Sequence, residues 1–361
     1  MPLTNKTQSS QTNEFNQYVK PVSLWADAWK RLRKNKMAIV GMWIVGIYIF
    51  VTFGASFLPF YSYTDQELFH ANLNPSFKPA GVVALERLKI REKEVARAVN
   101  EIGRADLKDD LERLQREISN LSKELDSNPV HKKVYILGTD SLGRDLLART
   151  IYGGQISIMI GLIGTLTAGL IGIVLGAIGG YFGGWFDNIL GRFVDLMYSL
   201  PYMLIVIIIM SMLPTGSNTI FVLYIAIAMI SWLTISRVVR GQIISLKNSE
   251  FVEAARSMGA SSERIIFRHL LPNTLGTIIV YSTLSFPSFI MNESFLSFLG
   301  LGVSAPMASW GTLVSDGVQG LQLYPWRLLV PGLAMTIFLF AMNFLGDGLR
   351  DALDPQSKNS N

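Results

Sequence analysis

The stretch IYGGQISIMIGLIGTLTAGLIGIVLGAIGGYFGGWF, residues 151–186, contains no charged side chain over 36 consecutive positions. A helix that crosses the ~30 Å hydrocarbon core of a bilayer needs about 20 largely apolar residues. The stretch is therefore long enough for a membrane-spanning helix, which we place at 157–182. Gly172, Gly176 and Gly180 recur every four residues in it, a spacing that lets a second helix approach closely in lipid.

Similar apolar runs occur on both sides of this stretch. They predict six membrane-spanning helices, at 37–58, 157–182, 195–213, 219–236, 275–299 and 326–346. The third and fourth spans are separated by a polar turn at 214–218. We therefore predict an all-α membrane protein with 37–58 as its first span. The segment 151–347 then forms a core that contains the other five spans.

The composition excludes several other classes. The chain of 361 residues is 50% hydrophobic and only 16% charged, whereas soluble proteins carry about 25% charged residues. It has no cysteine, and its three histidines, His70, His131 and His269, lack the spacing of a metal site on a helix. Neither a phosphate-binding loop nor a nucleophile elbow occurs. We expect no catalytic site, no metal and no bound cofactor on this chain.

The distribution of basic residues predicts the orientation. Residues 1–36 hold seven Lys or Arg and two acidic residues, and residues 237–274 hold six Lys or Arg. Because basic loops stay on the cytoplasmic side, we expect both termini and 237–274 to be cytoplasmic. The basic residues mark this inward bias, and they do not predict a nucleic-acid surface.

Both ends of the chain are expected to be cytoplasmic tails. Residues 1–20 are polar and are predicted to be disordered. The apolar residues of 24–32 share one helical face beside four basic residues, which is typical of an amphipathic helix in the membrane interface. We therefore interpret 1–36 as a tail with an interfacial helix, and 348–361 as a second tail.

The region between the first two spans, 59–150, contains an unusual charged insertion. Residues 84–126 hold ten Lys or Arg and eleven Asp or Glu. Leucine and isoleucine recur at spacings of three and four from Leu107 to Leu125, and 103–106 interrupts the pattern. The pattern predicts an extracytoplasmic helical hairpin at about 84–126, or else one long helix that pairs with another chain. The hairpin either docks a partner or is a tolerated insertion.

The cytoplasmic segment 248–273, NSEFVEAARSMGASSERIIFRHLLPN, predicts two short helices that meet at a glycine. Ser249 is a candidate cap for the first helix, and Gly259 is suited to end it in a left-handed conformation. Ser261 or Ser262 is expected to begin the second helix, and Pro272 to end it. Short helices with apolar knobs between two spans are suited to docking in a groove of another protein.

This segment also resembles the coupling motif of ABC-importer permeases, which reads Glu-Ala-Ala, three residues, Gly, nine residues, hydrophobic-x-Leu-Pro. The matching residues are Glu253, Ala254, Ala255, Gly259, Leu271 and Pro272. His269 replaces the usual Ile, but Arg-His-hydrophobic-Leu-Pro-Asn is similar to the peptide branch of the family. The resemblance implies that these seven residues form the coupling contact with an ATPase.

Further stretches resemble the C-type subunit of oligopeptide and dipeptide permeases, within the binding-protein-dependent importers. They are LGTDSLGRD at 137–145, followed by IYGG at 151–154, ESFLSFLGLG at 293–302 with Trp310-Gly311, and GDGLRDALDP at 346–355. The resemblance covers roughly 22–58 and 131–355, whereas 81–127 has no counterpart in short family members.

The resemblance implies a set of partners. They are a second homologous permease subunit, two ABC ATPase subunits that bind ATP, an extracytoplasmic solute-binding protein, a peptide substrate and the lipid bilayer. It places the chain in the bacterial cytoplasmic (inner) membrane as a multi-pass protein that is not itself an enzyme. An importer of nickel or another small solute is the alternative, and a secondary transporter is a more distant one, because no internal repeat is found.

Two neighbouring polar residues, Asn292 and Glu293, fall deep in the fifth predicted span. A carboxylate at that depth costs roughly 2.5–3.5 kcal/mol on insertion scales and is by default a functional candidate. It either lines the translocation path or has a structural role, in an ion pair with a buried arginine or in a hydrogen bond. We also expect Arg192 and Asp195 to pair with each other.

Overall fold

The computed structural model describes residues 24–212 and 219–353. In these ranges every regular element is helical, and the extended backbone forms a single antiparallel bridge between Thr139 and Asp145. The predicted all-helical class is confirmed. The predictions for 1–20, for the turn at 214–218 and for the last part of the second tail lie outside the described residues.

The α-helices are α1 Leu24–Leu32, α2 Lys36–Phe53, α3 Ala80–Glu101, α4 Lys108–Glu124, α5 Leu146–Phe182, α6 Gly184–Ser199, α7 Tyr202–Met212, α8 Thr219–Leu246, α9 Glu250–Ser257, α10 Ser262–Ile265, α11 Leu271–Phe298, α12 Trp310–Gln319 and α13 Trp326–Leu353.

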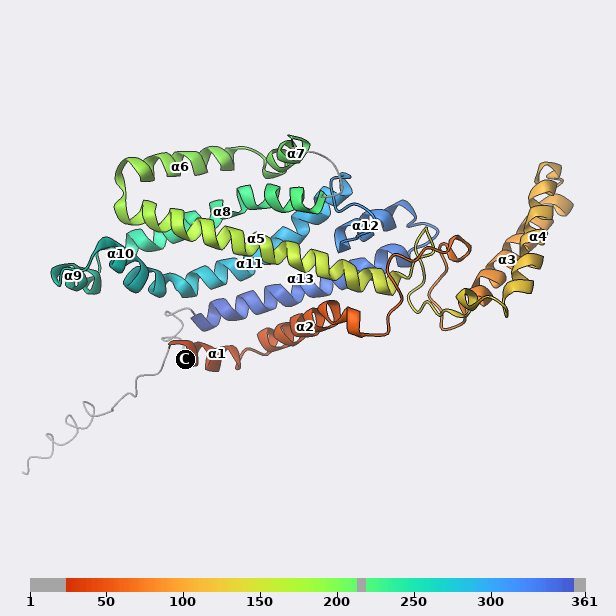
Figure 1. Cartoon of the computed structure of the whole chain (residues 1–361), viewed down its shortest axis with the longest axis horizontal. Coiled ribbons are helices and arrows are strands. Elements are labelled where there is room, and N and C mark those ends of the chain that lie inside the picture. Colours follow the sequence, from red (N-terminus) through yellow and green to blue (C-terminus); the bar gives the residue numbers. More distant parts are fainter. Residues whose placement is uncertain (1–23, 213–218, 354–361) are drawn as a thin grey trace, which may run out of the picture.

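The long helices α2, α5, α8, α11 and α13 run along one another and form an elongated bundle (Figure 1). Helices α9 and α10 lie at one end of it. The short helix α12 and the α3–α4 hairpin lie at the opposite end (Figure 1). Helix α1 packs through Ala28 and Leu32 on the last turns of α13, whereas Trp25 and Trp29 of α1 remain exposed.

Within the described ranges, five helices are long and apolar enough to cross a membrane: α2, α5, α8, the continuous run Ser262–Phe298, and α13. A sixth span is formed only if α6 and α7 are counted together, and these two helices meet at 93°. The prediction of one straight helix at 195–213 is therefore wrong. Leu200 is extended and Pro201 follows it, because a residue before proline is driven out of the helical region.

Several spans are longer than predicted. Helix α5 begins at Leu146 instead of 157, and α8 continues to Leu246 instead of 236. The charge of Arg237 had marked the predicted end of the α8 span, but the charged residues there are paired. On α8, Arg240 Nη2 lies 2.7 Å from Asp187 Oδ2, and Arg237 pairs with Asp195. The expected partner of Asp195, Arg192 on its own helix, is thus replaced by an arginine of the neighbouring helix.

Helices α5 and α8 approach each other at the backbone through the glycine stripe of α5. A methyl group placed on Gly172 would lie 2.9 Å from the nitrogen of Ser236, and one on Gly176 would lie 2.5 Å from the oxygen of Ser236. A methyl group on Gly180 would lie 2.9 Å from the oxygen of Arg240. No side chain fits in this contact, so the glycine spacing sets how closely the two helices pack.

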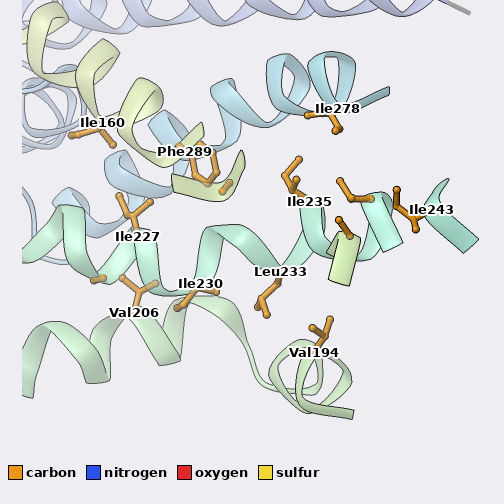
Figure 2. Packing of buried hydrophobic residues seen from close by; sticks show 14 of the residues in the cluster. Ile160, Val194, Val206, Ile227, Ile230, Leu233, Ile235, Ile243, Ile278 and Phe289 are labelled. Atoms are coloured by element: carbon orange, nitrogen blue, oxygen red, sulfur yellow. The ribbon is translucent and has the colours of Figure 1, made fainter. Parts of the chain in front are cut away.

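The largest buried apolar cluster surrounds α8. Figure 2 shows Ile227 and Ile230 of α8 between Val206 of α7 and Phe289 of α11, and Leu233 farther along α8 towards Val194 of α6. The cluster continues along α8 into the short helices α9 and α10. The bundle core and the α9–α10 end are therefore one packed unit.

The charged insertion forms an antiparallel pair, because α3 and α4 contact each other and are joined through Gly103 at φ +76°. Leu114 and Leu121 of the predicted seam are buried, and the other seam residues of α4 are half-buried. Glu92 lies on the seam, where its carboxylate accepts a hydrogen bond from Gln115 Nε2 at 3.1 Å. The chain thus does not adopt the alternative, one long helix that pairs with another chain.

A buried ion cluster fixes the N-terminal end of α5. Asp140 Oδ2 lies 2.7 Å from Arg144 Nε and 2.5 Å from Arg149 Nη1, and all three side chains are buried. The other oxygen of Asp140 accepts the backbone N–H groups of Leu142 and Arg144. Burial alone raises the pKa of Asp140, and attraction by the two arginines outweighs it, so the pKa lies below its ordinary value.

Candidate functional site

The segment between α8 and α11 is built as a helix, a left-handed glycine and a second helix. The N–H of Ala260 donates to the oxygen of Ala255 and that of Gly259 to the oxygen of Arg256, both at 3.0 Å. This pair of bonds is a Schellman motif, and Gly259 adopts φ +81° within it. No atom lies within 4 Å of a methyl group placed on Gly259. The backbone conformation, and not a lack of space, therefore favours glycine here.

Helix α9 has one face packed inward and one face open. Val252 and Ala255 are buried in the cluster that surrounds α8. Phe251 and Met258 are 40% and 81% exposed, and they lie beside the exposed residues Glu253 and Ala254. The open face thus combines apolar side chains with a carboxylate and faces away from the bundle.

The second helix begins as predicted but does not end at Pro272. Ser261 caps α10 by accepting the N–H of Arg264 at 3.3 Å. A π-helical turn, Ile266–Leu270, then leads directly into α11, and Pro272 lies in the first turn of that helix. Proline is tolerated there because first-turn N–H groups have no helical partner. The side chain of Asn273 donates to the oxygen of His269 at 2.6 Å.

The seven residues predicted for coupling do not form a single surface. Glu253, Ala254, Gly259 and Pro272 are exposed. Ala255 is buried, whereas His269 and Leu271 are half-buried at the start of α11. The exposed members are available to a partner, and the others attach the segment to the bundle. The residues that the motif did not include, Phe251 and Met258, supply the apolar part of the open face.

The two intramembrane candidates have different environments. Glu293 is fully buried, and its Oε1 accepts hydrogen bonds from the hydroxyls of Ser297 and Ser309 at 2.6 Å each. Asn292 is half-buried and lines two cavities of about 450 and 550 Å³. The two neighbouring side chains thus point in different directions. The hydroxyl contacts of Glu293 match the second predicted possibility, a structural role in a hydrogen bond.

Sequence reasoning missed the polar stripe to which Asn292 belongs. Ser285, Ser288 and Asn292 of α11 line the smaller of the two cavities, and Asn343 of α13 lines the larger one with Ser288 and Asn292. The spacing of three and then four residues along α11 is the signal that identifies a polar face on an apolar helix. Polar groups on a membrane helix are expected to face a cavity or a partner instead of lipid.

Comparison with known proteins identifies the family. Residues 172–359 match the family described as "Binding-protein-dependent transport system inner membrane component". Residues 23–75 match "N-terminal TM domain of oligopeptide transport permease C".

The chain belongs to the binding-protein-dependent transport permeases.

Members of this family from several bacteria are similar to the chain over most of its length. It is 37% identical to the oligopeptide transport system permease protein OppC of Bacillus subtilis over 337 residues, covering 93% of this chain and 91% of the relative. It is 46% identical to OppC of Escherichia coli K12 over 234 residues, covering 65% and 76%. Among solved structures, a chain of the inward-facing MetNI methionine ABC transporter aligns with a TM-score of 0.46 at 16% identity, covering 58% of this chain and 98% of that one.

Proposed function

We propose that this chain is a permease subunit of an ATP-driven importer in the bacterial cytoplasmic membrane, and that it forms part of the path for oligopeptides or dipeptides. The observation that carries the proposal is the open face of α9 at one end of a bundle that belongs to this family. The names of the relatives, which include a dipeptide transport system permease protein from Bacillus subtilis at 38% identity, support peptides as the solute.

The partners follow from the same proposal. A second permease subunit completes the path, two ATPase subunits hold ATP on the cytoplasmic side, and an external solute-binding protein delivers the peptide. In this arrangement α9 and α10 face the cytoplasm, both termini are cytoplasmic, and the α6–α7 pair serves as a broken third span. The excess of Lys and Arg in 1–36 and 237–274 supports this orientation.

Coupling is proposed to act through the packed face of α9. Val252 and Ala255 share one apolar cluster with Ile243, near the end of α8, and with Leu270, directly before α11. A partner that moves α9 therefore moves the ends of two membrane helices with it. Rigid displacement of helices between two packed arrangements is the physical basis of alternating access.

Charge reversal at Glu253 tests the docking surface. Because Glu253 is exposed, Glu253→Lys should leave the fold intact. A reversed charge within an interface costs several kcal/mol, so the ATPase that copurifies with the tagged permease should fall by at least about tenfold. Glu101→Lys, at an exposed position of α3 at the other end of the molecule, is the matched control. Equal recovery of the ATPase with both variants would contradict the proposal.

A substitution in the polar stripe tests whether Asn292 lines the translocation path. Asn292→Leu keeps the side-chain size but removes the amide from both cavities, so peptide uptake should fall several-fold in an importer that still assembles. Phe295→Leu on the same helix changes an exposed side chain that lines neither of these two cavities, and uptake should stay near wild type. Uptake, together with recovery of the complex, is the measurement. Wild-type uptake by Asn292→Leu would remove Asn292 from the path.

A further inference from the structure

Two buried histidines connect the base of the α3–α4 hairpin to the outer end of the bundle. His70 ends the short helix Leu68–His70, and His131 lies in the short helix Pro129–Lys132, which follows α4. Their side chains are 0% and 3% exposed, and Nε2 of His70 lies 3.0 Å from Nδ1 of His131. Two of the three histidines in the chain thus share one buried hydrogen bond.

The number of protons on the pair decides whether this bond exists. When both rings are neutral, or when one is charged, one of the facing nitrogens donates and the other accepts. When both rings are charged, both facing nitrogens carry a proton, so the bond is lost. Two positive charges then oppose each other in a buried site, which is strongly unfavourable. The closed arrangement therefore accepts one extra proton but not two.

Charged side chains lie on the His131 side of the pair. Glu124 of α4 places Oε2 3.9 Å from Nε2 of His131. Lys133 adds a positive charge nearby, although its ammonium also lies 3.6 Å from Asp65. Burial, followed by the effects of His131 and Lys133, lowers the pKa of His70 to about 4.

Asp65, Glu67 and Asp145 act on the neighbouring Tyr135, but no carboxylate among the described residues contributes to the pKa shift of His70. The ring of Tyr135 packs against His70 at 5.8 Å between centroids, and burial raises the pKa of its hydroxyl, which stays neutral. On the α3 side, Arg87 donates to the oxygen of Ala71, the residue that follows His70, at 2.7 Å. Helix α3 thus places a positive charge at the residue that follows His70. Nδ1 of His70 is buried without a hydrogen-bond partner among the described residues.

The pair lies at the point where three segments meet. A methyl group placed on Gly81 of α3 would lie 2.6 Å from Cβ of His131, so α3 contacts this ring directly. The oxygen of His70 accepts a hydrogen bond from the hydroxyl of Thr139, in the loop that leads to α5. Separation of the two rings would therefore loosen α3 and α4 from the segment that carries the Asp140 ion cluster.

We propose that the His70–His131 pair is a proton-sensitive joint, which holds the hairpin against the outer end of the bundle and releases it when both rings are protonated. The sign follows from linkage, because the released state binds the second proton more tightly. Closure is therefore complete above the ordinary histidine pKa and is lost as the pH falls towards the lower pKa of the closed state. A shift from 6.5 in the released state to about 4 in the closed state favours release about 20-fold more at pH 5 than at pH 7.

Hydrogen–deuterium exchange of the full-length protein in lipid nanodiscs tests this joint. Amides of α3 and α4 should show an opening constant about 20-fold higher at pH 5 than at pH 7, after correction for the pH dependence of intrinsic exchange. Amides of α5 and α8 should show no such rise. Equal opening constants of α3 and α4 at the two pH values would overturn the proposal.

The double variant His70→Gln/His131→Asn is the matched control. Its amides place polar atoms near the ε and δ positions of the two rings, so they keep a hydrogen bond that does not titrate, and the hairpin should be equally protected at both pH values. A wild-type pH response in this variant would overturn the proposal.

Two single variants provide a separate measurement if the double variant does not fold. Glu124→Gln removes a carboxylate that favours positive charge on the closed pair, so the release should shift to higher pH, and an unchanged midpoint would count against the joint. Asp145→Asn removes a carboxyl group whose pKa burial raises to about 6 and which lies outside the pair. The hairpin response should remain in this variant, and its loss would assign the response to Asp145 instead.

Discussion

Replacing Asp140 with asparagine is expected to destabilise the protein by about 3–5 kcal/mol, because the change leaves two buried guanidinium groups without their shared carboxylate. The wild-type carboxylate is 2.7 Å from Arg144 Nε and 2.5 Å from Arg149 Nη1. Asparagine keeps the shape but offers one uncharged oxygen to two charges. Thermal unfolding of the purified subunit in detergent, followed by tryptophan fluorescence, measures the loss.

An exposed ion pair provides the control for this prediction. Asp106 and Arg104 form a pair at 2.8 Å whose side chains are both more than half exposed. Solvent weakens such a pair, so Asp106→Asn should unfold at the wild-type temperature. If Asp140→Asn also unfolds at that temperature, the buried cluster does not stabilise the N-terminal end of α5.

The pH dependence of the Asp140 cluster has a defined sign. The two arginines hold the pKa of Asp140 below its ordinary value. The stability that this group contributes is therefore fully present above the unfolded-state pKa of about 3.9 and is lost as the pH falls through the lower folded-state value. Asp140→Asn should lose this acid-range dependence together with the stability itself.

Valine at Gly259 is expected to uncouple transport. A β-branched residue at φ +81° carries strain of about 1–3 kcal/mol, which corresponds to roughly 5- to 150-fold in the population of the correct turn. Because space around the position is open, the chain can respond by changing the turn and reorienting α9 relative to α10. Peptide uptake should fall by a similar factor while the subunit still reaches the membrane.

Two variants separate backbone strain from side-chain size. Gly259→Asn places a residue that tolerates the left-handed region in the same turn, so it should retain most of the uptake. Gly241 on α8 also has open space around it but a normal helical backbone, so Gly241→Val should transport well. Wild-type uptake by Gly259→Val would show that the turn does not take part in coupling.

The apolar runs predicted most membrane helices, because hydrocarbon requires long uncharged segments whatever the tertiary fold. Helix ends were less accurate, since a charge next to a run was interpreted as the boundary. Arg149, Arg237 and Arg240 lie inside helices because carboxylates distant in sequence pair with them. Such pairings depend on the packed structure and leave no local pattern.

The parts of the candidate site that depend on local sequence alone were predicted. Gly259 and Ser261 are local signals, and both act in the structure as their residue types indicate. Pro272 was wrong as a helix end, because the π-helical turn before it allows proline to begin α11. The different surroundings of Asn292 and Glu293 were not predictable, since adjacent positions on a helix differ by about 100° and hydropathy does not say which one faces the core.

Because their backbones are in close contact, α5 and α8 are expected to move together as one rigid body. Helix α8 has 28 residues and is therefore about 40 Å long, and α9 begins four residues after its end. A small tilt of α8 at its α9 end displaces its other end by a larger distance. The glycine stripe keeps α5 in register with α8, so α5 is expected to tilt with it. The other end of α5 carries the Asp140 cluster, so in the proposed coupling a tilt of α9 is expected to reach that end of the bundle as well.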